Sequence, residues 1–202
     1  MAFGGKYELI QNYIYMYHTK TFILIPQYPE STTDSMSANF SSTPVLSRSA
    51  PIFAYSNSGP RTLQVSLSLH RDMMNMFNLN VSNLKLKVGE DYIDTLVNQI
   101  QAIALPSYTD ASKMVNPPII ALRFGNDIFI KGVVQGGVSV TRKPPILQDN
   151  KYALIDISFN VSEIEPYDAQ TVMQNGSFRG LNTTLESNVW KTAPSGFTSS
   201  VR

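Results

Sequence analysis

The chain has no cysteine and only two histidines among its 202 residues. Without cysteine there can be no disulfide, no thiolate zinc site and no cysteine nucleophile, so cohesion must come from packing and from partners. His18 and His70 are the only imidazoles, so few side chains are available for a histidine-based catalytic centre. The absence of cysteine fits a protein that folds in a reducing cytoplasm.

Charge is also scarce. Charged residues make up 15% of the chain, against roughly 25% in typical soluble domains, and the formal net charge is +1. Serine, threonine, asparagine and glutamine take their place, which gives a surface suited to burial against protein. Because phosphate binding needs clustered lysine and arginine, we expect no sequence-specific nucleic-acid partner.

Long apolar runs are missing as well. No uninterrupted stretch of about 18 apolar residues occurs, and no basic flank precedes an apolar run near the N-terminus. We therefore expect neither a signal peptide nor a membrane partner. The 43% of hydrophobic residues is enough to fill the core of a single domain of this length.

Most of the apolar residues alternate with polar ones, which is the pattern of half-buried β-strands. Residues 61–70 place four aliphatic side chains on one face and polar side chains on the other, and residues 152–163 repeat the pattern. Between them, runs at 119–124, 127–134 and 137–142 predict an antiparallel meander. Gly125-Asn126 supplies a hairpin turn, and Gly136-Gly137 marks a bend or bulge.

One segment has a helical period instead. Apolar residues recur at steps of three and four between residues 91 and 105, and Pro106 follows. Glu90 and Asp91 precede the segment, where carboxylates stabilise the free amides of a helix N-terminus. The stripe is formed by Tyr92, Ile93, Leu96, Val97, Ile100 and Ile103.

Three segments are candidates for contacts with partners. In residues 7–27, alternation predicts one or two strands, and the tyrosines there pack as a half-buried surface or stack on a ligand.

Residues 28–48 are rich in proline, serine and threonine, a composition that predicts a long loop. Residues 166–202 predict an extended tail whose spaced aromatic side chains anchor it to another subunit. The candidate contacts are Tyr13, Tyr15, Tyr17, Tyr167, Phe178 and Trp190.

No constellation for catalysis stands out. Glu163 and Glu165 could form a carboxylate pair, but a solvated or salt-bridged strand end explains them as well. Gly132, Gly136 and Gly137 do not join a strand to a helix, and no Walker-type lysine follows them. We therefore expect a protein that is not an enzyme and that uses no metal or other cofactor.

Several short motifs follow one another in a definite order. After the strand at 61–70 and the helix, Asn-Pro-Pro-Ile-Ile-Ala-Leu-Arg-Phe-Gly occupies 116–125 and Ile-Lys-Gly-Val-Val occupies 130–134. The strand at 152–163 then ends in glutamate. Over residues 43–165 this order resembles the tube-type baseplate proteins of contractile phage tails and related injection systems.

The resemblance implies an antiparallel β-sandwich or barrel flanked by one α-helix, with six copies in a ring around a channel. It implies a tail-tube initiator, or an adaptor between hub and tube, whose partners are the tail-tube subunit and the baseplate hub and wedge proteins. The protein would be made in the host cytoplasm and reside in the virion. Residues 1–165 would form the tube-like domain, with an insertion at 73–88, and 166–202 the tail.

Two alternatives remain open. A peripheral wedge subunit of the baseplate shares the structural class but forms no closed ring. A carbohydrate-binding or cell-wall hydrolase β module would use the tyrosines as platforms and Glu163 or Glu165 as an acid.

Overall fold

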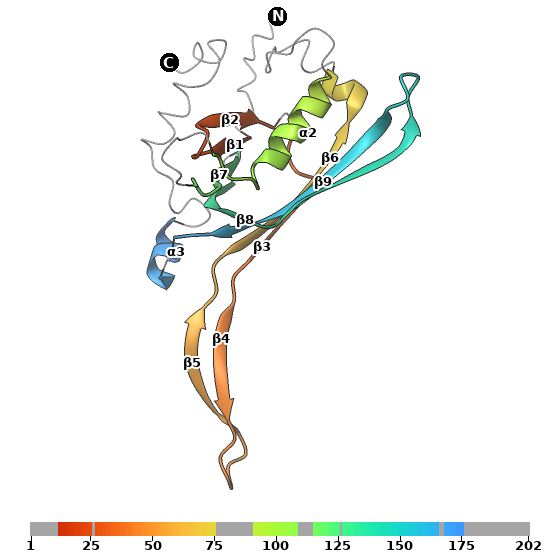
Figure 1. Cartoon of the computed structure of the whole chain (residues 1–202). Helices are drawn as coiled ribbons and strands as arrows, with labels where there is room; N and C mark the ends of the chain where they lie inside the picture. Colours follow the sequence, from red (N-terminus) through yellow and green to blue (C-terminus); the bar gives the residue numbers. More distant parts are fainter. Residues whose placement is uncertain are drawn as a thin grey trace, which may run out of the picture.

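One large sheet organises the molecule. The computed structural model describes residues 12–25, 27–75, 91–108, 115–125, 127–165 and 168–175 (Figure 1). Seven strands lie in the order β2-β1-β7-β8-β9-β6-β3, and every neighbouring pair is antiparallel. The expected mainly β, antiparallel fold is confirmed. Among the described strands β2 and β3 stay at opposite edges, so the sheet does not close into a barrel.

The strands of the sheet differ widely in length. The N-terminal strands are short, whereas β8 and β9 form a long hairpin that runs the length of the sheet (Figure 1). The bounds are β1 Tyr13–Met16, β2 Thr21–Leu24, β3 Ser31–Ser35, β6 Thr62–His70, β7 Ile119–Phe124, β8 Ile128–Ile146 and β9 Tyr152–Glu163.

The alternation in the sequence predicts correctly which residues of β6 and β9 are buried in the core. On β6 every second residue is fully buried, and the intervening Gln64 is exposed. β9 follows the same rule and pairs with the whole length of β6, so both apolar faces point to one side. The buried members of these two strands are Leu63, Val65, Leu67, Leu69, Ala153, Ile155, Ile157, Phe159 and Val161.

A helix covers this apolar side. Helix α2 spans Tyr92–Ala102 and lies across the sheet (Figure 1), with its predicted stripe buried. Asp91 caps it by accepting a hydrogen bond from the backbone N–H of Ile93. Arg71 and Lys151 then bind the carboxylates of both Asp91 and Asp94, with the Arg71–Asp94 pair at 3.0 Å. These ion pairs tie the helix N-terminus to the end of β6 and to the β8–β9 turn.

The meander has one strand fewer than expected. The runs at 127–134 and 137–142 belong to a single strand, β8, whose register with β9 shifts between Gln135 and Val138. The predicted irregularity at Gly136 and Gly137 is therefore a bulge within β8, where both glycines have positive φ. A bulge keeps the backbone pairing on either side of it, which is why the two runs stay joined.

The prediction of a loop over residues 28–48 is wrong. Strand β3 occupies Ser31–Ser35 and pairs with β6, and β4 occupies Ala38–Thr43 and pairs with β5, Ile52–Ser58. All residues of these three strands are exposed. Strands that bury neither face need no sustained apolar alternation, because backbone pairing alone defines them.

The C-terminal segment begins differently from expectation. Instead of an extended chain, residues Ala169–Asn175 form a short helix, α3, which Asp168 starts by accepting a hydrogen bond from the backbone N–H of Thr171 at 2.8 Å. The helix was missed because its seven residues carry no clear apolar stripe. The rest of the predicted tail lies outside the described residues, as does most of the predicted insertion at 73–88.

Candidate assembly surfaces

The most conspicuous surface is an exposed hairpin. Strands β4 and β5 pair only with each other and project from the sheet as an arm, which we define as residues 38–58 (Figure 1). None of the strand residues in the arm is buried. A two-stranded hairpin alone in water is at best marginally stable, so such an arm is expected to gain order from a partner.

One face of the arm is aromatic. Phe40 lies directly opposite Tyr55, with ring centroids 5.5 Å apart in an edge-to-face arrangement. Phe53 lies two residues from Tyr55 and so on the same face. These three side chains are 58%, 59% and 65% exposed in the order Phe40, Tyr55, Phe53. Aromatic side chains exposed in a cluster mark a protein contact more often than isolated ones do.

The second surface is the side of the sheet opposite the core. Two rows of directly paired side chains cross four strands there, one made only of serine and the other of threonine and amides. We call this surface the hydroxyl face. Its rows are Ser31, Ser66, Ser158 and Ser139, and Thr33, Gln64, Asn160 and Gln135.

The hydroxyl face continues toward the end of the β8–β9 hairpin with little net charge. Asp156 follows the rows and accepts a hydrogen bond from the Ser68 hydroxyl at 2.9 Å. Lys143 pairs with the same carboxylate at 2.5 Å, and this contact holds the pKa of Asp156 below its usual value. The result is a wall of hydroxyl and amide groups in which these two charges compensate each other.

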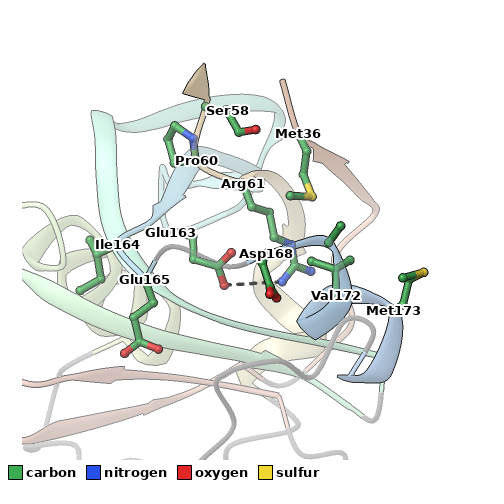
Figure 2. Close-up of a pocket in the computed structure, with 12 residues that line it drawn as sticks. Met36, Ser58, Pro60, Arg61, Glu163, Ile164, Glu165, Asp168, Val172 and Met173 are labelled. Carbon is green, nitrogen blue, oxygen red and sulfur yellow. Dashed lines mark ion pairs between the residues drawn. The ribbon is translucent and has the colours of Figure 1, made fainter. Parts of the chain in front are cut away.

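The third surface is a groove at the base of the arm. It encloses a cavity of about 740 Å³ between the β5–β6 junction, the end of β9 and helix α3 (Figure 2). Apolar and acidic side chains share its lining. We call it the basal groove; the residues used below are Met36, Ile164, Val172 and Met173, with Glu163, Glu165 and Asp168.

A buried arginine supports the groove. The side chain of Arg61 is fully buried, and its Nε and Nη2 donate to the Asp34 carboxylate at 2.6–2.9 Å. Nη1 donates to the carbonyl oxygen of Phe129 and lies 3.9 Å from the Glu163 carboxylate (Figure 2). Glu165 accepts a hydrogen bond from Lys131 at 2.6 Å. Glu163 and Glu165 therefore take part in ion pairs, as the salt-bridged interpretation of this strand end requires.

The three N-terminal tyrosines divide between core and surface. Tyr13 is completely buried against Phe22, and burial raises the pKa of its hydroxyl to about 12. Its ring packs inside the subunit and offers no surface to a partner. Tyr15 and Tyr17 are half-buried and pack edge to face at 5.1 Å, with the Lys131 ammonium 5.7 Å from the Tyr17 ring.

The remaining expectations concern the other candidate contacts, metal ions and membranes. The candidate contacts Tyr167, Phe178 and Trp190 are outside the described residues. Within the described ranges, no group of three or more histidine, aspartate or glutamate side chains could hold a metal ion. Over the same part of the chain, no helix has the length and apolar character needed to cross a membrane.

The sequence carries only a weak signal for the arm. Phe53 and Tyr55 alternate with smaller residues, but this pattern is too short to distinguish a strand from a loop. The serine row could not be found in this way, because it depends on which strands become neighbours.

A scan against protein-family models finds no match. A search of the curated proteins finds none either.

Proposed function

We propose that this protein is a structural subunit of a contractile tail baseplate, forming a ring that joins the central hub to the tail tube and starts tube assembly. The observation that carries the proposal is the arm, a hairpin with an exposed aromatic face that finds no burial within its own subunit. A surface of this kind is explained by assembly and has no evident use in a solitary protein.

The open sheet supports assembly as well. Strand β3 forms one edge of the sheet, and all five of its residues are exposed. An unprotected edge invites pairing with another chain, and ring formation is one way to cover it.

In such a ring the hydroxyl face lines the channel. A tube must let nucleic acid or protein pass without retaining it, and clustered cations would bind phosphate. The paired rows of serine, threonine and amide side chains supply a wetted wall, and the Lys143–Asp156 pair keeps the local charge balanced.

The test is assembly with the cognate tube subunit. Native mass spectrometry of the purified chain, alone and after mixing, followed by electron microscopy, should show closed rings that nucleate tubes, with β6 and β9 at the inner wall. A chain that stays monomeric and leaves tube polymerisation unchanged contradicts the proposal and favours a peripheral wedge subunit.

The matched variants are Phe53→Ser on the arm and Gln64→Ser on the hydroxyl face. Both remove an exposed side chain and leave the core intact. Phe53→Ser should abolish ring formation, whereas Gln64→Ser should leave rings and tube nucleation unchanged.

A further inference from the structure

We propose that the tip of the arm of one subunit docks into the basal groove of a second copy of this chain. The inference rests on the proposed ring assembly and names the two surfaces that would meet in it. It assigns a partner to both the arm tip and the groove.

The arm tip, residues 44–51 between β4 and β5, is largely apolar and carries a single charge. Leu46 at the tip is 96% exposed, the largest exposure among the large hydrophobic residues that the structure describes, and Val45 beside it is 38% exposed. A turn at the tip is closed by a hydrogen bond from the backbone N–H of Arg48 to the carbonyl oxygen of Val45 at 3.3 Å. Arg48 is the only charged residue between positions 35 and 60.

The basal groove has the complementary character. Met36, Val172 and Met173 give it an apolar wall, and Met173 is 80% exposed (Figure 2). The groove and the ion pairs beside it contain four carboxylates, Asp34, Glu163, Glu165 and Asp168, against two cations, Arg61 and Lys131. An apolar segment with one arginine therefore matches both the surface and the charge of the groove.

The tip cannot reach the groove of its own subunit while the arm stays extended. Met36 lines the groove, and the tip begins after Thr43, so Ser37 and the six residues of β4 separate the two. At about 3.3 Å per residue this is a distance of about 25 Å. In Figure 1 the arm points away from the sheet and α3. The occupant of the groove is therefore a tip from another copy.

This contact constrains how the subunits can assemble. The tip and the groove are different surfaces, so each subunit can give its tip to one neighbour and accept a tip from another, or two subunits can exchange tips across a two-fold axis. The first arrangement leads to a closed ring when the rotation between neighbours closes, and it is the arrangement that the proposed ring requires.

The absence of native cysteine makes the test direct. Two single variants, Leu46→Cys in the tip and Met173→Cys in the groove, are mixed with one of them carrying a mass tag, and the mixture is oxidised. We expect the disulfide-linked heterodimer to exceed either homodimer about tenfold. The control pair replaces Met173→Cys with Ser139→Cys, an exposed position on the hydroxyl face, and should give no such excess.

A charge variant tests the role of Arg48. Placing Arg48→Glu in the tip variant should lower the heterodimer yield about tenfold, because a carboxylate then faces an acidic groove. Arg48→Lys should retain most of the yield. Arg142→Glu, an equivalent reversal at an exposed position of β8, should have no effect.

The outcomes separate this inference from the proposed function. If the unmodified chain forms rings that nucleate tubes but the tip and groove variants give no heterodimer excess, the docking proposal is wrong and the ring function stands. A chain that stays monomeric and yields only chance cross-links overturns both. Cross-linking of both cysteines within one chain, in a variant carrying Leu46→Cys and Met173→Cys together, also overturns the docking proposal.

Discussion

Strand β6 of the sheet and strand β5 of the arm have comparable lengths but differ in what stabilises them. β6 has nine residues and fully buries four aliphatic side chains, whereas β5 has seven residues and buries none. The sheet has a helix packed on its apolar side, and the arm has only its own partner strand. Burial of apolar area, the main favourable contribution to folding, is thus concentrated in the sheet.

The comparison shows that the apolar core lies in the sheet, whereas the arm buries none of its strand residues. The two parts meet at the base of the arm, where the backbone N–H of Gly59 donates to the carbonyl oxygen of Ser37 at 2.8 Å. Substitutions in the sheet should therefore affect folding, and substitutions in the arm should affect assembly. Four predictions test this division.

The largest effect is expected in the core of the sheet. Leu67→Ala removes a completely buried side chain on β6 and should lower the free energy of unfolding by about 2–5 kcal/mol. Chemical denaturation followed by circular dichroism measures this difference. The control is Gln64→Ala on the opposite face of the same strand, which should change stability by less than about 0.5 kcal/mol. Equal effects at both positions would contradict a one-sided core.

A smaller effect is expected at the buried arginine. Asp34→Asn removes the carboxylate that accepts from Nε and Nη2 of Arg61, and leaves a buried guanidinium with weaker partners. Breaking a buried pair costs about 3–5 kcal/mol, and because Asp34 is partly exposed we expect about 2 kcal/mol. The same denaturation assay applies, with Thr32→Ala, an exposed neighbour on β3, as the near-neutral reference.

The ion pairs at the start of α2 predict a dependence on pH. Burial by itself would raise the pKa of Asp94, but hydrogen bonds from Arg71 and Lys151 outweigh it and hold the pKa below its usual value. The stabilisation is therefore present at neutral pH and is lost as the pH falls below about 4, through the folded-state pKa. Asp94→Asn should cost about 1 kcal/mol at pH 7.

This pH dependence is checked by thermal unfolding of both proteins across the acid range. The difference between wild type and Asp94→Asn should shrink steadily below pH 4. A difference that stayed constant down to pH 2 would show that the Asp94 charge contributes nothing.

The smallest effect on stability is expected from removing the arm. Replacing residues 38–58 by a short Asn-Gly turn joins Ser37 to Gly59, which are already hydrogen-bonded to each other. The free energy of unfolding should change by less than about 0.5 kcal/mol, because no strand residue of the arm is buried. Ring formation in native mass spectrometry should be lost, and an unfolded product would contradict the separation of sheet and arm.

The sequence by itself determined the parts that bury one face. Period-two alternation predicted β6 and β9, with the bounds of β9 correct at both ends, and a three-to-four period with an acidic cap predicted α2. These patterns are local because each element must direct its own apolar side chains to the core. Fully buried positions such as Leu67 and Ile100 follow directly from them.

Only the tertiary structure decided the arm, the basal groove and the serine row. The arm strands bury nothing, so no alternation in the sequence distinguishes them from a loop. The groove joins residues from β9 and α3 to Met36 and Arg61, more than 90 positions earlier in the chain. Ser66 and Ser158 become neighbours only because β6 pairs with β9 in one register, and register is set by the packing of the opposite, apolar face.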